Sequence, residues 1–129
     1  MSNNPNLLSP LSLAFVGDAV FTLETRKRLV EDANRPVNDL HRETVRYVNA
    51  ASQAQAIKKL LPVLDEDEQA VFKRGRNAHT GHTPKNQSEG DYHYATGLEA
   101  LFGYLYLTGK NERITELVDL IWSENNGKE

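Results

Sequence analysis

The sequence predicts an all-α domain built as a bundle of helices. Apolar residues recur at helical spacing in several segments, and no stretch shows the strict alternation that is typical of a half-buried strand. Proline, glycine, serine and asparagine fall between these segments, where helices begin and end. With 129 residues, 39% of them hydrophobic, the chain is long enough to fold as one domain, residues 1–129, around its own core.

Six helices are predicted from this periodicity and from the breaks between the segments. They cover approximately residues 10–31, 36–48, 50–61, 65–76, 91–108 and 112–123. Ser9 as N-cap and Pro10 in the first turn begin the first helix. Pro62 bends or ends the third helix, and residues 1–9 and 124–129 should be flexible.

Inward-facing residues are predicted from the spacing in the second, third and sixth helices. They are Val37, Leu40, Thr44 and Val48 in the second, Ala54, Ile57 and Leu61 in the third, and Ile114, Leu117, Val118 and Ile121 in the sixth. Each set recurs every three or four residues, so its members share one face of a helix.

The fourth helix carries charge signals at both ends. Asp65 and Glu68 have the spacing of a capping box, and acidic residues suit the N-terminus of a helix. Val71 and Phe72 should face inward, and the helix ends in a basic cluster, which suits a helix C-terminus.

The fifth helix is the most apolar segment and should lie at the centre of the bundle. Gly97 and Gly103 lower its helix propensity, so we expect them to permit close contact with neighbouring helices, and Gly109 should end it. Its expected core residues are Leu98, Leu101, Phe102, Leu105 and Tyr106.

Two of the apolar helices each contain a carboxylate. Asp18 lies in residues 13–21 and Glu99 in residues 95–103, so Asp18 should sit mid-helix on a largely buried segment. Because an unpaired buried carboxylate is costly, such groups are usually paired, bound to metal or protonated. If the two helices pack together, the carboxylates predict an oxygen-ligand site for a hard cation. The alternative is that each acid is solvated or pairs with an arginine.

The charge distribution indicates where a polyanion would bind. A net charge of −3 argues against a general polyanion binder, but residues 69–88 contain no acid. This part of the chain includes a long loop at residues 77–90, and long loops are often functional. The candidate phosphate contacts are Lys73, Arg74, Arg76 and Lys85, and the candidate contacts to sugar or phosphate oxygens are Asn77, His79 and Thr80. Ordinary solvated charge is the alternative for each.

Several other classes of protein are not indicated. Cysteine is absent, so no disulfide framework is predicted, and His79, His82 and His93 lack a fourth ligand for a zinc site. No basic n-region precedes the first apolar run, and Asp18 interrupts that run, so neither a signal peptide nor a membrane span is expected. We expect a cytoplasmic protein without membrane contact.

Three short sequences resemble motifs of the ribonuclease III family. Residues 15–20, Phe-Val-Gly-Asp-Ala-Val, resemble its signature Phe-Leu-Gly-Asp-Ala-Val. Residues 98–103, Leu-Glu-Ala-Leu-Phe-Gly, resemble its second acidic motif. With residues 73–78, Lys-Arg-Gly-Arg-Asn-Ala, they occur in matching order over residues 10–110. The resemblance is to Mini-ribonuclease III, the short form of the family without a double-stranded-RNA-binding domain.

This resemblance implies a helical endonuclease domain that cleaves double-stranded RNA. It implies Asp18 and Glu99 as catalytic metal ligands, Mg²⁺ as cofactor with Mn²⁺ as a substitute, and products with 5′-phosphate and 3′-hydroxyl ends. It also implies a homodimer in which Phe15 inserts into a socket on the partner. The implied substrate is the precursor of large-subunit (23S) ribosomal RNA, which would make the protein a factor in ribosome biogenesis.

The sequence departs from the larger family at three acidic positions. Ala14 and Thr96 stand where that family usually has the other two of its four site acids, so only Asp18 and Glu99 remain, and Leu11 stands where it often has a further glutamate. We therefore expect weaker Mg²⁺ affinity than a four-acid site would have. The missing acids also support an alternative, a non-catalytic RNA-binding or ribosome-assembly domain on the same fold.

Overall fold

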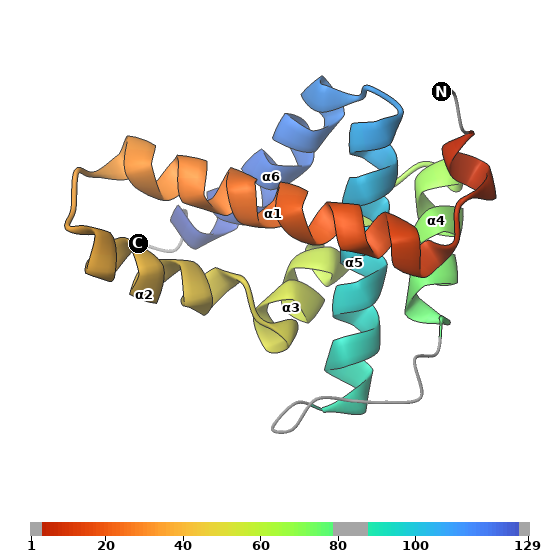
Figure 1. Ribbon diagram of the computed structural model, residues 1–129, viewed down its shortest axis with the longest axis horizontal. Helices are drawn as coiled ribbons and strands as arrows, with labels where there is room; N and C mark the ends of the chain where they lie inside the picture. Colours follow the sequence, from red (N-terminus) through yellow and green to blue (C-terminus); the bar gives the residue numbers. More distant parts are fainter. Residues whose placement is uncertain (1–3, 79–87, 127–129) are drawn as a thin grey trace.

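A computed structural model describes residues 4–78 and 88–126, and in these ranges the chain forms only helices (Figure 1). The α-helices are α1 (Pro10–Asp32), α2 (Val37–Tyr47), α3 (Ala50–Leu60), α4 (Glu66–Arg76), α5 (Glu89–Leu107) and α6 (Asn111–Asn126). Two 3₁₀ turns, η1 (Pro5–Leu7) and η2 (Leu61–Val63), precede α1 and follow α3. The predicted all-α class is confirmed.

The predicted helix limits agree with the structure to within a few residues. Helix α5 begins two residues earlier than predicted because the Ser88 Oγ caps it by accepting a hydrogen bond from the Asp91 amide at 3.0 Å. Helix α6 continues to residue 126, three residues beyond the predicted limit, because the backbone N–H groups of residues 124–126 extend its hydrogen-bonded ladder.

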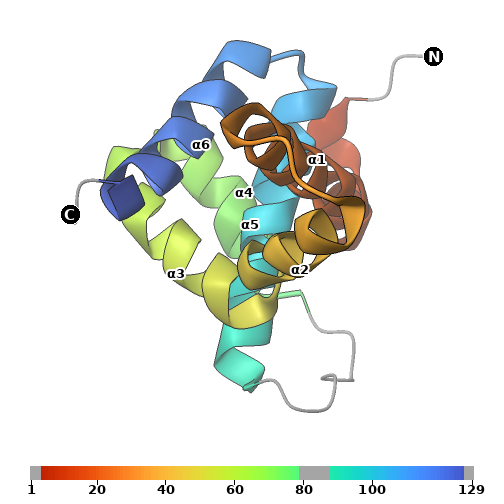
Figure 2. The same ribbon diagram turned by 90° about the vertical axis from the view of Figure 1, so that its left-hand side faces the viewer.

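Helix α5 forms the centre of the molecule. It packs against α1, α3, α4 and α6, and Figures 1 and 2 show it running through the middle while α1 crosses over it. Its fully buried side chains include Leu98, Leu101, Phe102 and Leu105, as predicted. Tyr106 is 53% exposed rather than inward-facing, because it lies in the last turn of the helix, where fewer neighbours cover it.

Glycines allow α1 and α5 to cross at backbone contact. A Cβ atom on Gly17 would lie 1.6 Å from the carbonyl oxygen of Glu99, and one on Gly103 would lie 1.9 Å from the carbonyl oxygen of Leu13. No side chain fits at these distances, so the prediction for Gly103 is confirmed. Gly109 ends α5 with φ 76°, a conformation that favours glycine.

Helices α2 and α3 bury fewer of the predicted residues. In α2 only Thr44 is buried, and Val37 is 63% exposed because it lies in the first turn of a helix that packs mainly against α1. In α3, Ala54 and Ile57 are buried as predicted, whereas Leu61 lies in η2 and is only partly buried. All four residues predicted to face inward from α6 are buried.

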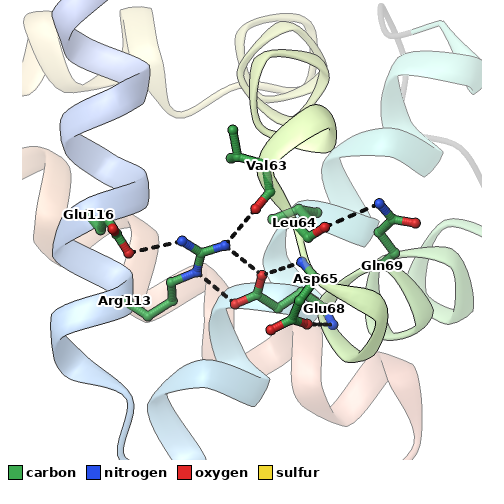
Figure 3. Close-up of polar contacts among 7 residues, drawn as sticks. All are labelled: Val63, Leu64, Asp65, Glu68, Gln69, Arg113 and Glu116. Atoms are coloured by element: carbon green, nitrogen blue, oxygen red, sulfur yellow. Dashed lines mark hydrogen bonds and ion pairs between the residues drawn. The ribbon is translucent and has the colours of Figure 1, made fainter.

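The capping box of α4 is present, and its glutamate makes further bonds that the sequence did not predict. Asp65 Oδ1 accepts from the Glu68 amide at 2.8 Å, and Glu68 Oε1 accepts from the Asp65 amide at 3.0 Å. Glu68 is 3% exposed, and Arg113 of α6 donates to both of its carboxylate oxygens at 2.8 Å (Figure 3). Arg113 also donates to the Val63 carbonyl at 2.8 Å and to Glu116 at 2.9 Å. This network joins α4, η2 and α6.

Candidate active site

The crossing of α1 and α5 brings together the two carboxylates that the sequence singled out. Asp18 follows Gly17 on α1, and Gly17 lies against the backbone of Glu99 on α5. Burial raises the pKa of Glu99 from 4.5 to about 8, together with the negative charge of Asp18 and a hydrogen bond with that side chain. The two side chains therefore form one coupled pair.

The two carboxylates are not equally buried. Glu99 is partly buried. Asp18 is exposed, although the segment around it is largely buried as predicted, with Leu13, Ala14, Gly17, Val20 and Phe21 buried. Gly17 occupies the face of α1 that touches α5, and the next residue of a helix points about 100° away from it. Asp18 consequently lies at the solvent edge of the crossing, where a large substrate reaches it.

Gln53 of α3 is a third member of the site. Its Nε2 donates to Glu99 Oε2 at 3.5 Å, and this hydrogen bond acts to lower the pKa of Glu99. Gln53 is not among the site residues predicted from the sequence. A signal was present, because Gln53 directly precedes Ala54 on the inward-facing side of the predicted helix, where an amide needs a partner.

The positions that carry acids in the larger family contribute no carboxylate here. Ala14 and Thr96 are buried, and the Thr96 hydroxyl donates to the Tyr92 carbonyl at 2.9 Å. Within residues 4–78 and 88–126, no group of three or more His, Cys, Asp or Glu side chains is placed to hold a metal ion. The charged donor set is therefore Asp18 and Glu99.

This donor set fits a hard divalent cation. Mg²⁺ is usually bound through one or two carboxylates and keeps several waters. Among the described residues, no arginine or lysine forms an ion pair with Asp18 or Glu99. Burial is the main cause of the raised pKa of Glu99, and the negative charge of Asp18 adds to it; a bound cation would offset this repulsion between the two carboxylates.

The predicted basic residues at the end of α4 have different surroundings. Lys73 is exposed. Arg74 donates from Nη2 to the Leu8 carbonyl at 2.9 Å, so it fastens the segment before α1 to α4. Asn77 is the C-cap residue of α4 and accepts from Arg76 Nε at 3.2 Å.

Arg76 belongs to a row of cations and rings that spans three helices. Its guanidinium carbon lies 5.6 Å from the ring centroid of Phe72, and the Phe72 and Tyr94 rings are 5.6 Å apart. Lys58 of α3 completes the row, with Nζ at 5.0 Å from the centroid of Tyr94. The row places a cation of α3 and one of α4 on either side of α5.

Three of the predicted RNA-binding residues lie outside the described residues. They are His79, Thr80 and Lys85.

Phe15 stands on the outer face of α1, in the same signature as Asp18. It is 83% exposed, and Leu11, Leu23 and Val30 are also exposed on this helix. The four residues, Leu11, Phe15, Leu23 and Val30, follow one another at intervals of four, eight and seven residues. Their side chains therefore form an apolar stripe along one side of α1. Large exposed apolar stripes usually mark contact surfaces.

Comparison with known proteins identifies the family. Residues 11–110 match the family described as the Ribonuclease III domain. The chain belongs to the ribonuclease III family. The Mini-ribonuclease 3 of Thermoanaerobacter sp. is 50% identical to it over 113 residues, covering 88% of this chain and 80% of the relative. That of Symbiobacterium thermophilum is 48% identical over 115 residues, covering 89% and 88%.

A solved structure has the same fold as this chain. A crystal structure of a Fusobacterium nucleatum protein superposes with a TM-score of 0.86 and 32% identity, covering 96% of this chain and 99% of that one. The resemblance to the short ribonuclease III form is confirmed, and the protein is an endoribonuclease acting on RNA. In the described part of the chain, no helix is both long and apolar enough to cross a membrane.

Proposed function

We propose that this ribonuclease III protein hydrolyses double-stranded RNA with Mg²⁺ held between Asp18 and Glu99, and with Mn²⁺ as a substitute. The observation that carries the proposal is the coupled carboxylate pair at the solvent edge of the α1–α5 crossing. Its oxygen donors suit a hard cation, and its exposed side admits a phosphodiester. With two acids in place of four, the expected Mg²⁺ affinity is weak.

Each side chain has a separate task in this proposal. Asp18 and Glu99 would hold Mg²⁺, which when bound would supply a water for attack and offset charge on the phosphate. Asp18 holds the exposed side of the site, and Glu99 holds the inner side. Because the pKa of Glu99 is about 8, this carboxyl group holds a proton at neutral pH in the metal-free protein, and a cation at the site would favour its ionised form. Hydrolysis in this way needs no side-chain nucleophile and leaves 5′-phosphate and 3′-hydroxyl ends.

The proposed cellular substrate is the precursor of 23S ribosomal RNA, processed in the cytoplasm during ribosome biogenesis. This part of the proposal depends on the resemblance to the short ribonuclease III form rather than on any single residue. Sequencing the ends of 23S precursors from cells with and without the protein tests it. Accumulation of precursors with unprocessed ends is the expected result, and unchanged ends would contradict it.

The catalytic assignment is tested by cleavage of a perfect RNA duplex in Mg²⁺. We expect Asp18→Asn and Glu99→Gln to lower kcat/KM by at least about 100-fold, because even groups that only support a metal ligand contribute about 10- to 100-fold. Glu31→Gln, which removes an exposed acid near the other end of α1, is the matched control. Wild-type activity in either site variant would contradict the assignment.

We further propose that the row from Lys58 to Arg76, with Lys73 beside it, contacts RNA phosphates. A protein reads an RNA duplex largely through its phosphates and 2′-hydroxyls, and a basic row over aromatic rings suits that contact. Arg76→Ala and Lys58→Ala should each weaken binding and reduce the slope of log Kd against log salt by about one.

The chain offers a control for this binding test. Lys110 also lies over a tyrosine, with Nζ 5.8 Å from the ring centroid of Tyr104, but it follows the opposite end of α5. Lys110→Ala removes the same kind of cation–ring contact and should leave the salt slope unchanged. An equal slope in Lys58→Ala, Lys110→Ala and the wild type would contradict the proposed surface.

A homodimer completes the proposal. The two strands of a duplex run antiparallel, so a two-fold dimer places one site at each strand. Phe15, 83% exposed in the single chain, would be covered by the partner. We expect dimers of the wild type and monomers of Phe15→Glu in sedimentation velocity, and a monomeric wild type would contradict the assignment.

A further inference from the structure

Gln53 is a buried polar residue beside the carboxylate pair. Its side chain is 4% exposed, and its Nε2 lies 3.5 Å from Glu99 Oε2. A buried amide without a partner costs about 1–3 kcal/mol, so a polar side chain at such a position needs a function in the structure or in the site. The amide nitrogen faces Glu99, and this donor favours the ionised form of the carboxyl group, the form that a cation needs.

The first turn of α3 holds Gln53 firmly against α5. Asn49 caps this helix, because its side-chain Oδ1 accepts a hydrogen bond from the backbone N–H of Ser52 at 2.9 Å. The backbone N–H of Gln53 donates to the backbone carbonyl of Asn49 at 2.9 Å. Ala50 and Ala54, on either side of Gln53, are both buried. Their small side chains allow α3 to approach α5 closely, so the amide reaches Glu99 from a rigid helix rather than from a loop.

The charge of the donor matters as much as its position. A lysine or arginine at residue 53 would neutralise Glu99 and compete with a metal cation. A neutral amide fixes the carboxylate through one oxygen and leaves its negative charge available. The amide nitrogen has no lone pair to offer a metal, so this contact supports a ligand without being one.

We infer that Gln53 is a positioning residue that holds Glu99 ready to bind the cation. By donating to Oε2, it restricts the rotation of the Glu99 carboxylate beside Asp18. This inference rests on the proposed function, because it assigns a supporting residue to the proposed Mg²⁺ site. Groups that support a metal ligand in this way typically contribute about 10- to 100-fold in metal affinity.

The test measures Mg²⁺ binding to the full chain without RNA, by isothermal calorimetry and by thermal unfolding. Gln53→Met keeps the length of the side chain and removes its donor. We expect it to raise the Kd for Mg²⁺ by about 10- to 100-fold. Gln69→Met is the matched control, because Gln69 lies on α4 and its Nε2 donates to the Leu64 carbonyl at 3.3 Å rather than to a carboxylate of the site (Figure 3). This control should lower Tm and leave the Kd unchanged.

A second variant keeps the inference testable should Gln53→Met fail to fold. Gln53→Glu adds a third carboxylate beside the pair, so it should lower Tm in EDTA and enlarge the rise in Tm caused by Mg²⁺. A residue that only fills space would give the lower Tm with no change in the effect of Mg²⁺.

The possible outcomes separate this inference from the proposed function. If the wild type binds Mg²⁺ and Gln53→Met binds it with the same Kd, the positioning role is overturned while the metal site remains. If Asp18→Asn and Glu99→Gln bind Mg²⁺ as the wild type does, the metal site itself is overturned, and the inference with it. The inference is supported if Gln53→Met binds Mg²⁺ more weakly than the wild type while Gln69→Met binds it with the wild-type Kd.

Discussion

Two glutamates of this molecule lie in similar positions and have opposite surroundings. Glu68 on α4 and Glu99 on α5 both reach toward the interior from helices that pack against each other. Glu68 meets the guanidinium of Arg113, whereas Glu99 meets the carboxylate of Asp18 and only a neutral amide, that of Gln53. Both carboxylate oxygens of Glu68 accept hydrogen bonds from a cation. Glu99 instead lies beside a second negative charge, and a bound cation would offset that repulsion.

The pKa values of the two acids follow from these surroundings. Desolvation by burial acts to raise the pKa of Glu68, but hydrogen bonds from Arg113 and from the Asp65 amide, with the charges of Arg113 and Lys110, outweigh it and hold that pKa below 4.5. For Glu99 desolvation and the charge of Asp18 act in the same direction, and the pKa rises to about 8. Burial alone therefore does not mark a functional acid. The sign of its neighbours does.

The largest effect is expected from a change at the contact between α1 and α5, which brings Asp18 to Glu99 and so makes the surroundings of Glu99 differ from those of Glu68. Gly17→Ala would place a Cβ 1.6 Å from the Glu99 carbonyl oxygen, so α1 must move off α5 and carry Asp18 away from Glu99. We expect a loss of more than about 4 kcal/mol in the free energy of unfolding, or failure to fold.

Gly90→Ala is the control for this variant, because nothing lies within 4 Å of a Cβ at that position in the first turn of α5. Its free energy of unfolding should change by no more than about 1 kcal/mol. Equal stability of the two variants in urea unfolding would show that the crossing is not as tight as described.

The second largest loss of stability is expected when the negative charge of Glu68 is removed. Glu68→Gln leaves the Arg113 guanidinium without its carboxylate partner, and breaking a buried pair in this way costs about 3–5 kcal/mol. Glu116→Gln removes the exposed acid that accepts from the same arginine, and should cost less than about 1 kcal/mol. Urea unfolding at pH 7 compares them, and the RNA-cleaving activity of folded Glu68→Gln should match the wild type.

A third prediction uses pH, because the two acids should change stability in opposite directions. The pKa of Glu68 is lowered in the folded state, so its stabilisation is present above pH 4.5 and is lost as pH falls through the folded pKa. The pKa of Glu99 is raised, so folding is most favoured below pH 4.5 and loses stability as pH rises toward 8. For this one group the slope is at most about 1.4 kcal/mol per pH unit.

Urea unfolding in EDTA between pH 4.5 and 8 measures this slope. Glu99→Gln should remove it and be more stable than the wild type at pH 8. If the wild type and Glu99→Gln keep a constant difference across this range, Glu99 does not have the raised pKa described above.

The smallest expected effect concerns RNA affinity without metal. In EDTA, Asp18 places an uncompensated negative charge where a phosphate should lie, so Asp18→Asn should bind duplex RNA about five-fold more tightly, since a charge pair at 4 Å in water is worth about 1 kcal/mol. Glu31→Gln is the control, because residue 31 is about 20 Å farther along α1 and is screened from the site at about 0.1 M salt. Tighter binding by both variants would indicate a general charge effect rather than a phosphate at Asp18.

The local chemistry of the chain was predictable from particular residues. Ser9, Asp65 and Gly109 occupy the capping and terminating positions that their side chains favour, and the helix limits follow from them. Only one of the two interactions of Glu68 was predictable from neighbouring residues. Its spacing from Asp65 predicts the capping box, but Arg113, 45 residues later, is brought to it only by the packing of α6.

The sequence by itself determined the helices, the central position of α5 and the two carboxylates as candidates, because capping, apolar periodicity and motif order are properties of neighbouring residues. Only the tertiary structure decided the exposure of Asp18, the pairing of Glu68 with Arg113 and the placement of Gln53 against Glu99. The physical reason is that burial and charge environment depend on which helix faces meet, and residues far apart in the chain determine that contact together.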